Sequence, residues 1–118
     1  HPTPIKPTMF TTTPQYLDYI INDPLRLTSA SAAFFMQSTR MDRAIRKADS
    51  RPRPPILTFL AGEDQIIDNE ATRELVTRDP GRNVTIINYE DQTHSIQLDA
   101  PERMTRDIAK WISTLPRN

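Results

Sequence analysis

The sequence predicts an α/β protein whose second half is a strand–helix–strand–helix (βαβα) unit preceded by helical segments. Two short apolar runs, ILTFLAG at 56–62 and VTIINY at 84–89, have the length and composition of buried strands in a parallel sheet. A helical pattern follows each run, and residues 56–89 are enough for a right-handed parallel βαβ crossover. A proline-rich boundary separates this unit from the earlier helices.

The composition excludes several classes of protein. Fifteen Lys and Arg residues balance fifteen Asp and Glu residues, with no basic patch interleaved with aromatic residues, so we expect no nucleic-acid partner. The lack of cysteine excludes disulfides, thiolate zinc sites and a cysteine nucleophile. We expect no cofactor and no resident metal ion.

The location is predicted from what the sequence lacks. No apolar run approaches the roughly 18 residues of a membrane span, and no signal peptide is visible. These features favour a cytoplasmic location. The chain begins at His1 rather than at a methionine, however, and we expect it to be part of something longer.

The first half is predicted to be helical after an irregular lead-in at 1–13. A short helix is expected at 13–21, with Thr13 as N-cap and Pro14 in its first turn. A longer helix is expected at 29–48. Its apolar residues Phe34, Phe35 and Met36 have two interpretations, a packed helix face or a wall that contacts an apolar ligand.

The segment DSRPRPP at 49–55 marks a change in the character of the chain. Three prolines and two arginines in seven residues do not fit regular structure. We therefore divide the chain into a helical segment at 1–54 and a βαβα segment at 55–118.

Two helices are predicted in the second half. Asp68 or Asn69 is expected to cap a helix that runs to about Arg78, and Gly81 then suits a left-handed or turn position. Asp99 is expected to cap the final helix, with Pro101 in its first turn. The residues at helical spacing on one side of this last helix are Met104, Ile108, Trp111, Ile112 and Leu115.

Two parallel strands buried on both faces need neighbouring strands, and the sequence contains no convincing third one. A two-stranded parallel sheet leaves backbone edges unpaired. We therefore expect the chain to be the C-terminal part of a larger α/β domain.

An acid and a base follow the two predicted strands. Asp64 lies in the loop after the first strand, and His94 lies in the loop after the second. Because parallel strands end at the same edge of a sheet, the two side chains are expected to be close. A carboxylate bonded to one ring nitrogen of histidine leaves the other nitrogen free to act as a general base. An ordinary structural histidine remains the alternative.

Two stretches resemble a known family. PILTFLAGEDQIIDNEATREL and VTIINYEDQTHSIQLDAPERMTRDIAKWI are similar to the C-terminal part of α/β-hydrolases, in particular the monoacylglycerol lipase and lysophospholipase-like serine hydrolases. The resemblance implies that Asp64 is the acid of a catalytic triad and His94 its base.

The resemblance extends into the first half. YIINDPLRLTSASAAFF is similar to the helical cap that these lipases insert before the strand that bears the acid. This implies that 1–54 is a cap or lid and that Phe34, Phe35 and Met36 contact the acyl chain of an ester or lipid substrate.

The chain departs from the family in lacking a nucleophile. It contains no G-x-S-x-G elbow and no HG oxyanion loop, and its only glycines are Gly62 and Gly81. Ser95 follows the histidine but stands in no elbow, so we interpret it as a loop serine. Since the chain order in this fold is Ser, Asp, His, the nucleophile is expected on a missing N-terminal half, which would be the partner of this chain. The chain alone is expected to be inactive.

Three other functions stay open. Haloalkane dehalogenases and epoxide hydrolases share the acid and histidine but attack with an aspartate. A non-enzymatic binding module that keeps the architecture is a second possibility. A metal site built from His94, Asp91 and Asp99 is a remote third.

Overall fold

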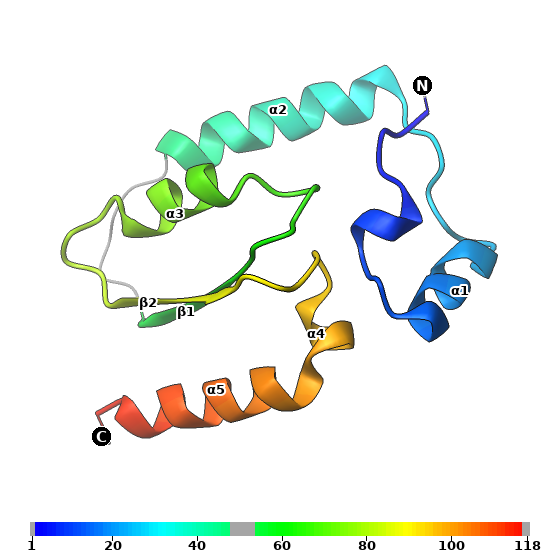
Figure 1. Ribbon diagram of the computed structural model, residues 1–118. Helices are drawn as coiled ribbons and strands as arrows, with labels where there is room; N and C mark the ends of the chain where they lie inside the picture. The colour runs from blue at the N-terminus through cyan, green and yellow to red at the C-terminus, as the bar shows by residue number, and fades with distance from the viewer. Residues whose placement is uncertain (1, 48–53, 117–118) are drawn as a thin grey trace.

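The computed structural model describes residues 2–47 and 54–116, and Figure 1 shows their arrangement. His1, Ala48 and most of the proline-rich boundary lie outside the described residues. The elements in chain order are η1 (Pro7–Met9), α1 (Pro14–Asn22), α2 (Ala32–Lys47), β1 (Ile56–Ala61), α3 (Asn69–Thr77), β2 (Val84–Tyr89), α4 (Ile96–Asp99) and α5 (Pro101–Thr114).

The two predicted strands form a parallel pair. The register runs from Ile56 opposite Val84 to Ala61 opposite Tyr89. The strands therefore begin together and end together, which confirms the predicted βαβ unit. Among the described residues the sheet has only these two strands.

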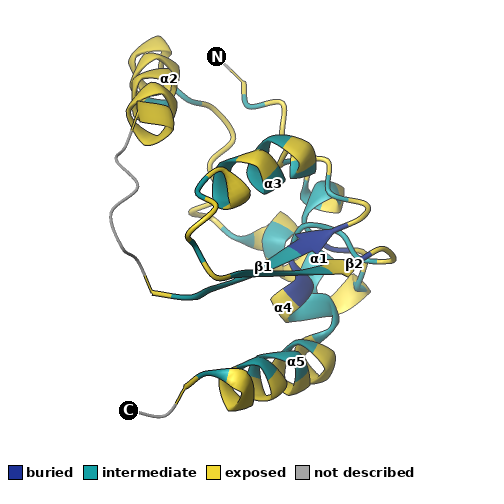
Figure 2. Ribbon diagram, turned by 90° about the vertical axis from the view of Figure 1, so that its left-hand side faces the viewer, coloured by how far each residue is buried: buried dark blue, intermediate teal, exposed yellow. Residues whose placement is uncertain are grey.

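Helices cover both faces of the pair. Figure 1 shows α3 on one side and α5 on the other, and Figure 2 gives the same arrangement from a view turned by 90°. Arg73 of α3 donates to the Asn88 side chain at 3.2 Å. On the opposite face, the indole N–H of Trp111 donates to Thr85 Oγ1 at 3.1 Å. Successive side chains of a strand point to opposite faces of the sheet, so in β2 Asn88 faces α3 and Thr85 faces α5.

The core lies at the carboxyl ends of the strands, on the side of α5 and α4. Its buried members are Ala61, Tyr89 and Ile96. The ring of Phe59 packs on that of Tyr89 with centroids 5.6 Å apart, and the Tyr89 hydroxyl donates to Asp107 on α5. The predicted burial on both faces holds only at the end of β1, where Leu60 and Ala61 are buried. In β2 Tyr89 is buried but Asn88 is exposed, and the first four residues of each strand are only half-buried.

Helix α1 begins at the predicted residue, but α2 begins later than predicted. Helix α2 starts at Ala32 rather than at residue 29. The hydroxyl of Ser31, the residue before this start, accepts from the Phe34 N–H at 3.2 Å. None of its residues is buried, so Phe34, Phe35 and Met36 do not form a packed helix face within the described residues.

The loops of the second half correct one prediction, confirm one and resolve one. Asp68, rather than Asn69, is the N-cap of α3, since its carboxylate accepts from the Ala71 N–H at 3.0 Å. Gly81 lies in a turn closed by the Arg82 N–H and the Asp79 carbonyl at 3.1 Å, which confirms the turn position and not the left-handed one. Asp99 does not cap the last helix, because a short helix, α4, ends at that residue and its carboxylate accepts hydrogen bonds from threonine hydroxyls instead.

The last helix presents a narrower apolar side than the spacing predicts. Met104, Ile108, Trp111 and Leu115 are half-buried, whereas Ile112 is exposed. No helix in the described part of the chain is long and apolar enough to cross a membrane.

Replacement of Gly62 by alanine is expected to destabilise the fold by about 1–3 kcal/mol. A Cβ on Gly62 would lie 2.6 Å from the Cα and 2.8 Å from the carbonyl carbon of Glu90, and backbone cannot move aside as a side chain can. Urea unfolding followed by circular dichroism measures the loss. Gly81→Ala is the matched control, because its Cβ would meet only Asp79 Oδ1 at 3.5 Å. Equal stability of the two variants would contradict this close approach.

The stability of the protein at high pH is expected to depend on Tyr89. Burial and the neighbouring Asp107 raise the pKa of Tyr89 to about 12, against an ordinary value of 10.0. Between these values an unfolded Tyr89 ionises while a folded one keeps its proton, so the free energy of unfolding falls as pH rises.

Tyr89→Phe removes this dependence and also the donor to Asp107. We expect the variant to be about 1 kcal/mol less stable than wild type at pH 8. The difference in the free energy of unfolding between wild type and the variant should fall by up to about 1.4 kcal/mol per pH unit above pH 10. Urea unfolding at several pH values checks this, with Tyr19→Phe, at a side chain 72% exposed, as the control. A gap that stays constant to pH 12 would refute the prediction.

Candidate active site

The loops that follow β1 and β2 are held side by side by backbone hydrogen bonds. The Gly62 N–H donates to the Tyr89 carbonyl at 2.8 Å, and the Glu63 N–H donates to the Gln92 carbonyl at 2.9 Å. These bonds continue the strand pairing past the end of the sheet. The residues after Ala61 and after Tyr89 are thereby fixed relative to one another.

The loop after β1 holds the Asp64 side chain in one orientation. The Asp64 N–H donates to the Ala61 carbonyl at 3.2 Å, which closes a tight turn. Its Oδ1 accepts from the Ile66 and Ile67 N–H groups at 2.8 and 3.0 Å. One carboxylate oxygen is therefore occupied by backbone donors, and the other is left for a partner.

That partner is His94. Asp64 Oδ2 lies 2.9 Å from His94 Nδ1, so the structure brings the two predicted residues together. The Asp64 side chain is 7% exposed and that of His94 is 31% exposed. A carboxylate acceptor requires the proton on Nδ1, which directs the lone pair of the neutral ring to Nε2.

The surroundings of Asp64 keep its carboxylate ionised at neutral pH. Burial alone would raise the pKa of the Asp64 carboxyl, but hydrogen bonds from the Ile67 N–H, His94 and the Ile66 N–H outweigh it. The net effect lowers the pKa below its ordinary value. Asp64 therefore remains an acceptor that fixes the tautomer of His94 and would stabilise its protonated ring.

A third segment completes the site, and the sequence analysis did not identify it. The carbonyl of Phe10 accepts from the Ser95 N–H at 2.7 Å and from Thr93 Oγ1 at 3.1 Å. The Phe10 ring stands edge-on to the His94 ring, with centroids 5.7 Å apart. No motif marks Phe10, because these contacts join residues more than 80 positions apart in the chain.

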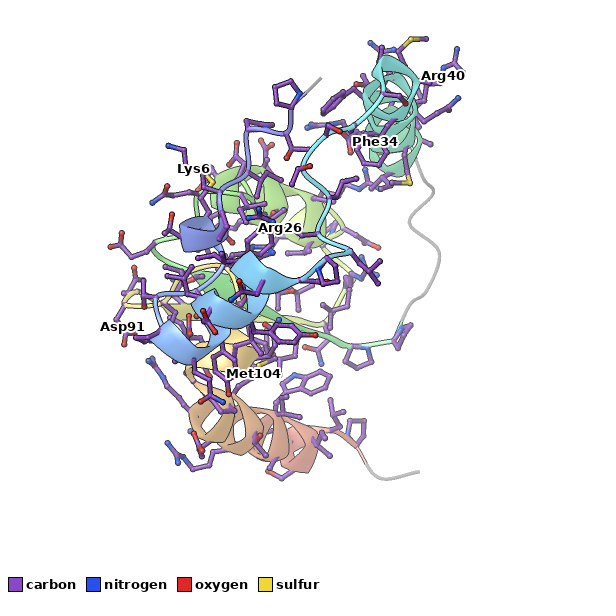
Figure 3. The ribbon with its side chains drawn as sticks, turned by 90° about the vertical axis from the view of Figure 1, so that its right-hand side faces the viewer. Lys6, Arg26, Phe34, Arg40, Asp91 and Met104 are labelled. Atoms are coloured by element: carbon purple, nitrogen blue, oxygen red, sulfur yellow. The ribbon has the colours of Figure 1, made fainter. Side chains whose placement is uncertain are left out.

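Ser95 and the three apolar residues of α2 lie outside this pair. Ser95 is buried, and its backbone holds the loop to Phe10, as expected of a loop serine. Phe34, Phe35 and Met36 are 53%, 40% and 57% exposed on α2. Figure 3 shows Phe34 well apart from Asp91, which lies in the loop that carries His94.

The alternative metal site is not formed. Within residues 2–47 and 54–116 no three His, Cys, Asp or Glu side chains are grouped so as to hold a metal ion. The exposed Asp91 pairs with Arg103 at 3.1 Å, while Asp99 accepts from threonine hydroxyls.

Phe10 also borders an apolar hollow. The hollow has a volume of about 410 Å³, and most of its wall comes from the lead-in segment, α1 and the connection to α2. Its lining includes Lys6 and Arg26, which Figure 3 labels. Phe10 therefore both lines this hollow and contacts His94.

Comparison with known structures supports the fold. The chain is similar to the monoacylglycerol lipase of Paleococcus ferrophilus, with a TM-score of 0.77 and 25% sequence identity. The match covers 94% of this chain and 44% of the lipase, so the chain spans less than half the length of that protein. A comparison with curated proteins gives no match.

A comparison with protein families identifies one that spans most of the chain. The family described as serine aminopeptidase, S33, matches residues 2–101, which include both strands, Asp64 and His94. This chain therefore belongs to the S33 serine aminopeptidase family of α/β-hydrolases.

Proposed function

We propose that this chain supplies the acid, Asp64, and the base, His94, of the catalytic triad of a serine hydrolase. The observation that carries the proposal is the 2.9 Å contact between Asp64 Oδ2 and His94 Nδ1 at the ends of two adjacent parallel strands. In this proposal the nucleophilic serine belongs to an N-terminal part of the same fold, since the 118 residues contain no G-x-S-x-G elbow.

The reaction follows from the proton positions. His94 Nε2 removes the proton of the serine hydroxyl as the oxygen attacks the substrate carbonyl, and the imidazolium that forms is stabilised by Asp64. The same proton then passes to the leaving alcohol. Water repeats the sequence to release the acid and restore the serine.

The proposed substrates are carboxylic esters with an apolar acyl group, as in lipases and lysophospholipases. The apolar hollow lined by Phe10, which also contacts His94, supports this, together with the exposed apolar side chains on α2. Residues 1–54 would form the cap over the site, with Phe34, Phe35 and Met36 in contact with the acyl chain.

Two other functions are compatible with the same fold. A dehalogenase or epoxide hydrolase would keep Asp64 and His94 but attack with an aspartate. A binding module would keep the fold and need neither side chain. The nucleophile of the whole protein distinguishes a dehalogenase or epoxide hydrolase, which uses an aspartate, from a serine hydrolase.

In the whole protein, Asp64→Asn and His94→Gln are each expected to lower kcat for a p-nitrophenyl ester by about 10³–10⁴-fold. Asn at 64 would favour the wrong tautomer of His94, and Gln at 94 removes the base. Asp91→Asn, at an exposed carboxylate, is the matched control and should retain wild-type activity. Wild-type rates in both triad variants would exclude the proposed roles.

A fluorophosphonate probe tests the nucleophile. The whole protein should be labelled at one serine, and His94→Gln should slow the labelling. The 118-residue chain by itself should remain unlabelled, Ser95 included. Hydrolysis without serine labelling would instead support attack by an aspartate.

The cap role is tested by acyl-chain length. Phe34→Ser is expected to raise KM about 10-fold for a long-chain ester, because about 25 cal/mol is lost per Å² of apolar contact, and to leave KM for a short-chain ester unchanged. Met41→Ser, at another exposed apolar residue of α2, is the control. Equal effects of both substitutions, or equal effects on both esters, would contradict a contact with the acyl chain.

A further inference from the structure

We propose that Asp99 is a positioning residue, which uses three threonine hydroxyls to fix the His94 loop to the segment that leads into α1. The inference rests on the proposed function, since it concerns how the base is held. Among the described residues Asp99 has no hydrogen bond to His94, so it would act through Thr93, which precedes the histidine, and through residues 10–13.

The Asp99 carboxylate joins segments from opposite ends of the chain. Its Oδ1 accepts from the Thr11 hydroxyl and, at 2.7 Å, from the Thr13 hydroxyl. Its Oδ2 accepts from Thr93 Oγ1 at 3.1 Å. Thr11 is fully buried, and its own oxygen accepts from the Thr13 N–H at 3.1 Å. The side chain predicted to cap a helix therefore connects residues 11–13 to the residue before His94.

The same segment contacts His94 and its neighbours directly. Phe10, next to Thr11, packs its ring edge-on to His94, and its carbonyl accepts from Thr93 and from Ser95. His94 is therefore held on one side by Asp64 and on the other by a strap of residues 10–13. Asp99 joins this strap to Thr93 a second time, in addition to the Phe10 carbonyl.

The contacts favour an ionised carboxylate at this position. Its Oδ1 accepts the protons of Thr11 and Thr13, and its Oδ2 shares the single proton of Thr93 with the Phe10 carbonyl. Burial would raise the pKa of Asp99, but the hydrogen bonds from Thr11, Thr13 and Thr93 outweigh it and lower the pKa below its ordinary value. An asparagine keeps the shape but replaces one acceptor oxygen with an amide donor.

The strap belongs to the segment that forms the proposed cap. Because α1 begins at Pro14, directly after Thr13, a displacement of α1 would be transmitted through Asp99 to the His94 loop. The structure thus couples the position of the first helix to the orientation of the base.

The test uses Asp99→Asn in the whole enzyme. A loosened base is expected to lower kcat about 10- to 100-fold with KM for a short-chain ester unchanged, and to slow fluorophosphonate labelling to a similar extent. The Nδ1–H proton resonance of His94 should exchange faster with solvent, a change that a loss of stability elsewhere would not produce. Asp91→Asn is the control and should match wild type in all three measurements.

A second pair of variants covers the case in which Asp99→Asn fails to fold. Thr93→Val removes the hydroxyl whose single proton is shared between Asp99 Oδ2 and the Phe10 carbonyl, whereas Thr93→Ser keeps it. We expect the valine variant to lose activity about 10-fold and the serine variant to recover most of that loss.

The outcomes separate this inference from the proposed function. If His94→Gln abolishes activity but Asp99→Asn and Thr93→Val behave like Asp91→Asn, the positioning role is wrong and the triad stands. If His94→Gln is fully active, the proposed function fails first.

Discussion

The in-register pairing of β1 with β2 is the constraint on which the rest of the structure depends. Because Ala61 lies opposite Tyr89, both strands end at one level, and two further backbone bonds extend the pairing into the loops. This common edge brings the Asp64 and His94 side chains to 2.9 Å despite 30 positions of separation. The close approach of Gly62 to the Glu90 backbone is the steric consequence of the same register.

The second organising interaction is polar and closes the chain on itself. The Asp99 carboxylate and the Phe10 carbonyl together accept hydrogen bonds from residues that lie near both ends of the sequence. Hydrogen bonds to a charged, half-buried carboxylate are stronger than those between neutral groups. This explains how the lead-in segment is held although it contributes few buried apolar side chains. The site is consequently assembled from three segments rather than two.

The described structure leaves much apolar surface uncovered. Twelve large apolar side chains are exposed, most of them on the lead-in segment, α1, α2 and their connection, whereas the fully buried apolar residues cluster at the strand ends. Each strand also has a single neighbour within the described residues. A surface of this kind is expected of a protein that packs against further structure. It is consistent with the proposal that strands and a nucleophile from another part of the fold complete the enzyme.

The sequence by itself determined the type and order of the main elements and the pair at the strand ends. The spacing of apolar residues and the positions of glycine and proline define local structure to within a few residues. Because the two strands of a βαβ unit are parallel, their ends meet at one edge of the sheet, which brings Asp64 and His94 together. Only the tertiary structure decided the hydrogen-bond partners of Asp99, the place of Phe10 and the exposure of α2. An aspartate before a helix can cap it or bond elsewhere, and which occurs depends on threonines more than 80 residues away that no local pattern reveals.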